Sequence, residues 1–425
     1  MLYAFILGRV YTLSLAEVLR VLEKEGIGHT LKTVAPEIAL IETEEKLPAQ
    51  KIQSLLGGTI KIVEIVDTLN RKKKDWPSDL LKDYLDFKVL SQKYLKQTSS
   101  KIQIGVSIYV MDTDVRLPFS EPKRVAQLLK KYLQSHDMSV RFVMPEAPSN
   151  NLPSVVVTNN HLLEKGAEFV VLLGRQNLTL GKTLTVQDFE DYGRRDYQRP
   201  FRDLKMGMLP PKVAQVMINF SGAKPGETIL DPFCGGGTVL QEALLMNIGA
   251  VGSDIDVNAV HGAEANLTWF RNRYHIAPGK YEILKLDATS ELSREFKPGD
   301  FEAIVTEGWL GPLYTEFPKD EQIKTNFKNL RDVYIKAFEE FKKIIKPGGK
   351  IVICLPAYRL EKHKYIFFPS LDFIEALGYS IEAPLTKELI EKYQFLRITE
   401  RNSIVYERKE QIVAREIFIL TSNSQ

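Results

Sequence analysis

The chain has 425 residues, 44% of them hydrophobic and 26% charged, a composition that excludes a disordered or low-complexity protein. No stretch approaches the roughly 18 apolar residues of a membrane span, and residues 1–10 lack the features of a secretory signal. With two cysteines and six histidines, none at metal-ligand spacing, we expect a cytoplasmic protein without disulfides or a metal site.

The net charge of +3 is unevenly distributed along the chain. Residues 1–200 carry 28 basic and 24 acidic side chains, whereas residues 201–425 carry 29 and 30. This asymmetry favours a surface for polyanions in the N-terminal half. The basic run at residues 71–74 could contact phosphates, and a solvated loop is the alternative interpretation of that run.

The first 66 residues predict the order strand, helix, strand, strand, helix, strand, which is typical of a ferredoxin-like domain. Ser14 followed by Glu17 resembles a capping box at the first helix. A charged helical connector is expected at residues 78–96. The strands are expected at 2–7, 29–34, 38–42 and 59–66, and the helices at 14–25 and 48–56.

A second small α/β unit is predicted after the connector. It contains a strongly amphipathic basic helix at residues 121–136 and strands at 102–110, 139–144, 154–158 and 168–173. From residue 199 onward, strands and helices alternate as in a parallel, doubly wound sheet. The expected domain boundaries are 1–75, 76–98 for the connector, 99–190 and 199–425.

The C-terminal domain can be followed strand by strand. Its strands are expected at 229–230, 250–253, 282–286, 303–305, 351–355 and 379–382, with 401–408 and 414–420 as a final antiparallel hairpin. Its helices are expected at 239–246, from 259 and at 330–345.

The most informative motif lies at residues 228–238. A short apolar strand ends in Asp231, three consecutive glycines follow at 235–237, and a helix-forming run comes next. Such a strand, glycine loop and helix hold nucleotide-like cofactors in doubly wound folds. The spacing fits neither the dinucleotide fingerprint nor the P-loop. A carboxylate before the glycines suits the ammonium group of S-adenosyl-L-methionine, so the motif indicates a methyltransferase.

Further carboxylates follow successive predicted strands. Asp254 ends the second strand, where such folds bind ribose hydroxyls, and the alternative for Asp256 is a cap of the next helix. Asp287, followed by Ala288, is placed to accept from an adenine amino group. Any one of these carboxylates could simply close a turn. Their succession after the glycine loop favours cofactor binding.

Residues 199–219 and 231–238 closely resemble the archaeal and eukaryotic tRNA guanosine-N2 methyltransferases that act on guanosine 10. Residues 185–196 are similar to the end of that family's THUMP domain, and residues 7–17 to the start of its ferredoxin-like domain. The resemblance implies a Rossmann-like α/β domain that methylates a guanine amine with S-adenosyl-L-methionine. It also implies N-terminal α+β domains that bind tRNA and a possible small activating protein partner.

The resemblance further implies the residues of the cofactor site. Asp254 would hold the ribose and Asp287 the adenine, with Ile255 and Ala288 beside them. The methionine part would be covered by Lys205, Met208, Leu209 and Pro210, and its ammonium end lined by Asp231, Cys234, Gly235, Gly237 and Thr238.

One motif departs from the family. Its members usually have Asp or Asn and then Pro-Pro-Tyr or Pro-Pro-Phe after the fourth strand; the acid or amide and a proline carbonyl accept from the target amine, and the aromatic ring stacks on the base. This chain has Glu307, Gly308 and Trp309 at that place. We expect Glu307 to be the amine acceptor and Trp309 the base platform, which requires an extruded base. Gly308 adds freedom that prolines would remove.

Three functions remain open on the sequence alone. The first is guanine-N2 methylation of tRNA, and the second is methylation of an amine at another tRNA position, in rRNA or in DNA. The THUMP-like region argues against DNA. The third is a noncatalytic homologue that keeps the cofactor and RNA sites. Trp309 has an alternative role as a core or lid aromatic.

Overall fold

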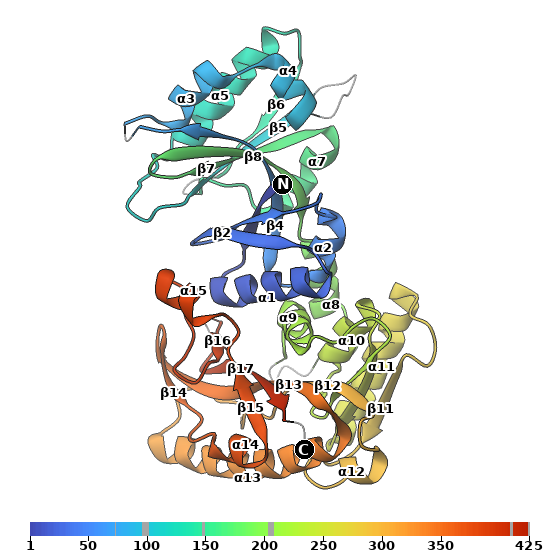
Figure 1. Ribbon diagram of the computed structural model, residues 1–425. Coiled ribbons are helices and arrows are strands. Elements are labelled where there is room, and N and C mark those ends of the chain that lie inside the picture. The colour runs from blue at the N-terminus through green and yellow to red at the C-terminus, as the bar shows by residue number, and fades with distance from the viewer. Residues whose placement is uncertain (73, 96–101, 147–148, 203–207, 409–410, 424–425) are drawn as a thin grey trace. The chain divides into compact units, whose positions relative to one another are not determined.

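The computed structural model describes residues 1–72, 74–95, 102–146, 149–202, 208–408 and 411–423. The chain divides into two compact units (Figure 1). The first consists of residues 1–11, 22–54 and 59–190, and the second of residues 12–21, 55–58 and 191–425. In the part of the chain that is described, no helix has the length and apolarity needed to cross a membrane.

The first unit is built on an eight-stranded sheet with the order β2-β3-β1-β4-β8-β7-β5-β6. Its strands are β1 (Leu2–Leu7), β2 (His29–Ala35), β3 (Ile38–Thr43), β4 (Thr59–Asn70), β5 (Ile102–Val110), β6 (Val140–Val143), β7 (Gly166–Leu173) and β8 (Asn177–Val186). The helical segments of the first 190 residues are α1 (Tyr11–Lys24), α2 (Ala49–Leu55), α3 (Pro77–Tyr84), α4 (Phe87–Val89), η1 (Leu90–Tyr94), α5 (Glu121–Gln134), α6 (Ser154–Asn159) and α7 (Leu162–Lys165); α8 (Phe189–Tyr197) follows them.

Strand β8 was not predicted, and it joins the two halves of this sheet. It pairs antiparallel with β4 from Lys61↔Val186 to Asn70↔Asn177, and with β7 on its other side. Gly181 interrupts the β-forming pattern of the strand, yet a side chain there would meet the Glu64 carbonyl oxygen at 2.6 Å. The predicted ferredoxin-like and THUMP segments therefore share one continuous sheet, while the domain boundaries remain a prediction.

The predicted strand at residues 154–158 is wrong, because this segment forms helix α6. Its β-branched residues favour a strand, but Val157 is fully buried in a cluster with Val143, Leu152 and Leu162. Tertiary packing overrides the local preference. On the same unit, α3 and α5 lie on one side of the sheet (Figure 1), where Val125 and Leu129 of α5 contribute to its core.

Arg71 of the basic run at 71–74 does not behave as a solvated phosphate ligand. It is buried, and its guanidinium donates to the carbonyl oxygens of Asp75 at 2.9 Å and Gly174 at 3.1 Å. Lys72 and Lys74 are exposed, and Lys73 lies outside the described residues. Arg71 therefore stabilises a turn of the first unit through these hydrogen bonds.

The second unit contains a sheet whose main path is β11-β10-β9-β12-β13-β17-β15. Its strands are β9 (Thr228–Asp231), β10 (Gly249–Asp254), β11 (Tyr281–Lys285), β12 (Phe301–Glu307), β13 (Ile345–Glu361), β14 (Lys364–Phe367), β15 (Tyr379–Glu382), β16 (Ile404–Tyr406) and β17 (Val413–Ser422). Its helices after α8 are α9 (Pro211–Ser221), α10 (Thr238–Leu245), α11 (Val257–Tyr274), α12 (Leu292–Glu295), α13 (Asp320–Ile344), α14 (Asp372–Ala376) and α15 (Lys387–Lys392).

Strands β9 to β13 run parallel, whereas β17 is antiparallel to β13, β15 and β16. The predicted doubly wound sheet and its final antiparallel hairpin are therefore confirmed. Helices α9, α10 and α11 lie on one side of the sheet, and α12, α13 and α14 on the other (Figure 1). This is the Rossmann-like arrangement, in which both faces of a parallel sheet are covered.

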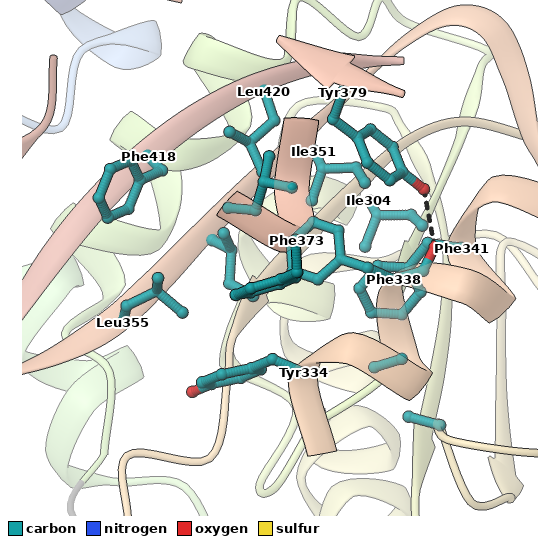
Figure 2. Packing of buried hydrophobic residues seen from close by; sticks show 14 of the residues in the cluster. Ile304, Tyr334, Phe338, Phe341, Ile351, Leu355, Phe373, Tyr379, Phe418 and Leu420 are labelled. Atoms are coloured by element: carbon teal, nitrogen blue, oxygen red, sulfur yellow. Dashed lines mark hydrogen bonds between the residues drawn. The ribbon is translucent and has the colours of Figure 1, made fainter. Parts of the chain in front are cut away.

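An aromatic core holds α13 against this sheet. Figure 2 shows Phe338 and Phe373 packed together beside Ile351, and the Tyr379 hydroxyl donates to the Phe338 carbonyl oxygen at 2.9 Å. Tyr334 lies at the edge of this cluster with its hydroxyl directed away from it (Figure 2). The cluster is apolar apart from such hydroxyl groups, so close packing holds α13 against the sheet.

The predicted capping box at Ser14 and Glu17 is wrong, because α1 begins at Tyr11 and both residues lie inside the helix. Glu17 is fully buried and accepts from the backbone N–H groups of Gly57 at 2.8 Å and Gly58 at 2.7 Å. It also accepts from the Asn219 amide of α9 at 2.8 Å. The carboxylate therefore ties two N-terminal segments into the second unit.

Candidate active site

The site lies where the order of the second sheet reverses. Strand β9 has β10 on one side and β12 on the other. The chain first adds β10 and β11 on one side of β9, and then returns to add β12 and β13 on the opposite side. Ligands of doubly wound folds bind at such a switch point, outside the carboxyl ends of the strands. Asp231 ends β9 and Glu307 ends β12. The fold thus brings together two carboxylates that are 76 positions apart in the sequence.

The glycine loop turns sharply between β9 and α10. Gly235 and Gly237 have φ angles of +49° and +77°, a region that favours glycine. Gly237 is the N-cap of α10. The Gly235 N–H donates to the Asp254 carboxylate at 3.0 Å, and the Cys234 N–H donates to the Ser253 carbonyl oxygen at 3.0 Å. The end of β10 therefore fixes the loop that follows β9.

A cavity that is partly open to solvent lies over this loop. Seven residues predicted from the sequence line it: Met208, Leu209, Asp231, Cys234, Gly235, Thr238 and Glu307. Four further lining residues were not predicted: Phe201, Phe233, Gly236 and Val239. Phe233, Gly236 and Val239 lie within or next to the predicted motif at 228–238, and Phe201 lies in the resembling segment at 199–219. Neighbourhood to these two segments could therefore have indicated all four residues.

Two buried side chains connect the segment around residue 200 to the glycine loop. The Asn266 amide of α11 donates to the carbonyl oxygens of Phe201 at 3.0 Å and Gly236 at 2.9 Å, and its oxygen accepts from the Phe201 N–H. The Arg199 guanidinium donates to the Thr238 hydroxyl at 2.6 Å. Burial lowers the pKa of Arg199. These contacts explain why residues near 200 belong to the same wall as the loop.

Asp231 is the buried carboxyl group of the cavity. Its pKa is raised to about 7, chiefly by burial, while the nearby Thr306 hydroxyl and the hydrogen bond from the Phe233 N–H lower it and the charges of Asp254 and Glu307 raise it. Burial also raises the pKa of the neighbouring Cys234 thiol, so that the thiol stays neutral. A cation entering the cavity would relieve the desolvation of Asp231.

The other predicted cofactor residues lie outside the lined cavity. Asp254 accepts from the Asp256 N–H at 2.9 Å as well as from the loop, and burial raises its pKa. Asp256 caps α11 by accepting from the Asn258 N–H, which confirms the alternative role considered for it. Asp287 accepts from the Thr289 N–H and hydroxyl. Predicted residues of this group are Pro210, Gly237, Asp254, Ile255, Asp287 and Ala288.

These positions differ in exposure. Ile255 is 65% exposed beside Asp254, whereas Ala288 is buried beside Asp287. Pro210 is the N-cap of α9. Lys205 lies outside the described residues. The assignments to ribose and adenine therefore remain predictions.

Glu307, the predicted amine acceptor, forms an ion pair that the sequence did not indicate. The Nε–H of Arg415 on β17 donates to its Oε1 atom. Arg415 is buried, and the same guanidinium donates to Gln411 at 3.0 Å and to the Met208 carbonyl oxygen at 3.4 Å. Burial lowers the pKa of Arg415, but the surrounding acidic groups, Glu307 foremost, together outweigh burial and raise that pKa.

The loop after Glu307 is held by α13 in place of the absent prolines. A Cβ on Gly308 would meet the Tyr334 ring at 2.8 Å, and the Tyr334 hydroxyl donates to the Trp309 carbonyl oxygen at 2.6 Å. Gly311 has a φ of +97°, and a side chain there would overlap Asn326 at 2.2 Å. The freedom expected from Gly308 is therefore removed by the close approach of Tyr334.

Trp309 is 47% exposed, so it is not a core aromatic, whereas its alternative role as a lid aromatic stays a prediction. Its backbone is anchored through Tyr334 while its ring is accessible. Trp309 is not among the residues that line the cavity, but it follows Glu307, which does, by two positions. Its exposed aromatic ring offers a stacking surface for a base.

The residues of the cavity fit S-adenosyl-L-methionine. The buried carboxylate of Asp231 matches its ammonium group, the glycine loop allows close approach of its chain, and Met208, Leu209 and Phe201 supply an apolar wall. The fold and this cavity define a methyltransferase domain of the Rossmann-like class. Residues 198–363 match the family model described as UPF0020, RMKL-like, methyltransferase domain.

Curated relatives confirm the resemblance found in the sequence. Over 181 residues the chain is 33% identical to the tRNA (guanine(10)-N2)-dimethyltransferase of Methanothermobacter thermautotrophicus, covering 42% of this chain and 47% of that one. The Pyrococcus abyssi protein of the same name is 28% identical, with 44% and 46% covered. The Xenopus laevis tRNA (guanine(10)-N(2))-methyltransferase TRMT11 is 24% identical, with 45% and 48% covered. The chain thus matches about half the length of these relatives.

Solved structures agree at the level of the fold. TrmN from Thermus thermophilus has a TM-score of 0.54 at 15% identity, with 99% of this chain and 100% of that chain covered. A possible methylase from Clostridium difficile 630 has a TM-score of 0.53 at 12% identity, with 100% and 99% covered.

Proposed function

We propose that this protein transfers a methyl group from S-adenosyl-L-methionine to the exocyclic N2 amine of a guanine in tRNA, at position 10. The observation that carries the proposal is the cavity itself: the Glu307 carboxylate lines the same cavity as Asp231 and the glycine loop. A cation-binding carboxylate and an amine acceptor thus face one space. The names of the relatives support guanine N2 as the target.

The reaction needs positioning more than a strong base. The cofactor supplies an activated methyl group on its sulfonium sulfur. Asp231 would bind its ammonium group and so orient the methionine chain along the loop. Glu307 would accept an N–H of the guanine amine, which turns the nitrogen lone pair toward the methyl group. After transfer, the nitrogen carries an extra proton and releases it to this carboxylate or to water.

The base would be held from two sides. Trp309 would stack on the extruded guanine, and the Gly308 carbonyl oxygen stands at the position where family members use a proline carbonyl as a second acceptor. The Trp309 carbonyl is already engaged by Tyr334. A base taken out of its helix loses its stacking partners, so an accessible aromatic ring compensates part of that loss.

The first unit is the proposed tRNA-binding part, as its resemblance to ferredoxin-like and THUMP domains suggests. Helix α5 presents exposed lysines at positions 123, 130 and 131. Phosphate contacts of this kind make affinity fall steeply with salt. Replacing Lys130 and Lys131 by Glu in the full chain should therefore weaken tRNA binding and flatten its salt dependence, while S-adenosyl-L-methionine affinity stays unchanged.

The test of the function uses tRNA from a strain that lacks this protein. Digestion and mass spectrometry should show the loss of an N2-methylated guanosine, and the purified protein should restore it with S-adenosyl-L-methionine. A tRNA transcript with adenosine at position 10 should receive no methyl group. Restoration of a different methylated nucleoside would instead support the second function, an amine at another position.

A further inference from the structure

We propose that Arg415 is a positioning residue for the amine acceptor, and that its pair with Glu307 replaces the rigid geometry that two prolines give in related enzymes. The inference rests on the proposed function, because it assigns Glu307 the role of acceptor. Arg415 is too deeply buried to touch a substrate. It would act only through Glu307.

The first argument is geometric. Glu307 is one methylene longer than aspartate, so its carboxylate has an additional torsion to fix. The planar guanidinium of Arg415 is itself held by acceptors on two further segments, Gln411 and Met208. It therefore presents Nε–H to Glu307 in one orientation.

The pairing leaves one carboxylate oxygen for a ligand. Arg415 occupies Oε1 of Glu307, and among the described residues no hydrogen bond engages Oε2. Glu307 lines the cavity and its side chain is 16% exposed, whereas that of Arg415 is 2% exposed. The guanidinium thus lies behind the carboxylate, and the remaining oxygen is available to an amine.

The second argument is electrostatic. Several titratable groups face Glu307: Asp231 on β9, Cys354 on β13, Tyr334 on α13 and Arg415 on β17. Burial raises the pKa of Cys354 and Tyr334, so both stay neutral, and Asp231 is an anion or neutral. Among these groups Arg415 is the one cation.

Without that guanidinium, the Glu307 carboxylate would lose the donor that holds its Oε1 atom in place. A carboxylate that is free to rotate presents its other oxygen to an amine in the reactive geometry less often. Arg415 therefore keeps the acceptor oxygen of Glu307 in one position. This consequence separates a positioning role from a purely structural one.

The experiment compares full-length wild type with R415M, measuring methyl transfer to a tRNA transcript that carries guanosine at position 10. Rates are measured from pH 6 to 9 with saturating S-adenosyl-L-methionine, so that Asp231 is occupied. R415M should lower kcat by about 10- to 100-fold, equal to about 1.4 to 2.7 kcal/mol. KM for the tRNA and the affinity for S-adenosylhomocysteine should stay within about twofold, so that the loss falls on kcat.

Two variants isolate the cause. In an E307Q background, R415M should add little further loss of kcat, because a positioning residue acts only through Glu307. R415K restores a cation without the planar fork, so it should recover only part of kcat. If R415M does not fold, the kcat of R415K tests the inference in its place, and an unchanged kcat would contradict it.

The matched control is R401M. Arg401 pairs with Glu416, which is buried one position further along β17 and does not line the cavity. R401M should lower thermal stability without lowering kcat. Unchanged kcat in R415M, with an active wild type, would overturn the inference alone. A wild type that methylates no tRNA would overturn the proposed function and this role with it.

Discussion

The Tyr334 hydroxyl, at the end of a fully buried ring on α13, donates to the Trp309 carbonyl oxygen at 2.6 Å. This contact joins the hydrophobic core of the second unit to the loop that follows Glu307. It anchors the backbone of a residue whose own side chain is 47% exposed. The backbone of the proposed base platform is thus held in place, and its Trp309 side chain is the part exposed to solvent.

Y334F should therefore slow methyl transfer by loosening this loop. One hydrogen bond is worth about 1 kcal/mol, or about fivefold in rate if the loop must be ordered in the transition state. Affinity for S-adenosylhomocysteine should not change. Y379F is the matched control, because Tyr379 makes a comparable bond to the Phe338 carbonyl oxygen of the same helix. Equal rates for the two variants would argue against a role of the Tyr334 bond in the loop.

G308A should displace the catalytic loop. The added Cβ would lie 2.8 Å from the Tyr334 ring and hydroxyl, closer than such contacts allow. We expect a loss of at least about tenfold in kcat with intact cofactor binding, since overlap of this kind costs about 1–3 kcal/mol. G193A on α8 is the control, because nothing lies within 4 Å of a Cβ there. If G308A keeps full activity, the loop has more room than the structure shows.

Cofactor affinity should depend on pH through Asp231. Its pKa of about 7 means that the carboxylate is largely protonated below pH 7, and an ammonium ligand must displace that proton. Affinity should fall about tenfold per pH unit well below 7, and binding should release a proton, seen by calorimetry in buffers of different ionisation enthalpy. D231N should remove the proton release and weaken binding, whereas D256N, which keeps a helix cap, should do neither.

The raised pKa of Asp231 also makes the free energy of unfolding depend on pH. The folded state raises the pKa of Asp231 from 3.8 to about 7, so the folded protein holds this proton more tightly than the unfolded chain does. The contribution of Asp231 to the free energy of unfolding is therefore full below pH 3.8 and is lost as the pH rises toward 7. The unfolding free energy of D231N should lack this component. The difference between wild type and D231N in denaturant melts from pH 4 to 8 measures it.

W309A should raise KM for tRNA or lower kcat by about 10-fold or more, as the loss of one base–aromatic stack is worth about 1–3 kcal/mol. W309F should keep most of the activity. L360A removes another exposed apolar side chain, 53% exposed, and should be silent. Equal activity of W309A and wild type would remove Trp309 from the site.

Much of the fold follows from local pattern. Strands such as β5 and β15 were predicted with their observed bounds, and the glycine-loop motif indicated part of the cavity lining, whereas Asp254 and Asp287 lie outside that lining. Strand β8 was missed because Gly181 interrupts its β-forming pattern. A glycine is needed there because the Glu64 carbonyl oxygen on the neighbouring strand β4 leaves no room for a side chain. Residues 154–158 were assigned to the wrong element because the burial of Val157 outweighs its propensity.

The candidate site was predictable where its residues are close in sequence. Asp231, Cys234, Gly235 and Thr238 follow from one motif. The partner of Glu307 did not follow, because Arg415 lies 108 positions away on an antiparallel strand inserted beside β13. Nor could the sequence show that Tyr334 fills the space a side chain at position 308 would need. Such relations depend on how distant elements pack.

Glu17 and the turn at residues 57–58 belong to the second unit although they are encoded among the strands of the first. Suppose that the N-terminal modules of two related enzymes were exchanged at a single junction near residue 190. The exchange would then remove the buried Glu17 carboxylate, to which the Asn219 amide donates. A working chimera would need the host's own residues 12–21 and 55–58 grafted into the incoming module. The second unit is encoded by three stretches of chain, residues 12–21, 55–58 and 191–425, which any exchange of modules has to change together.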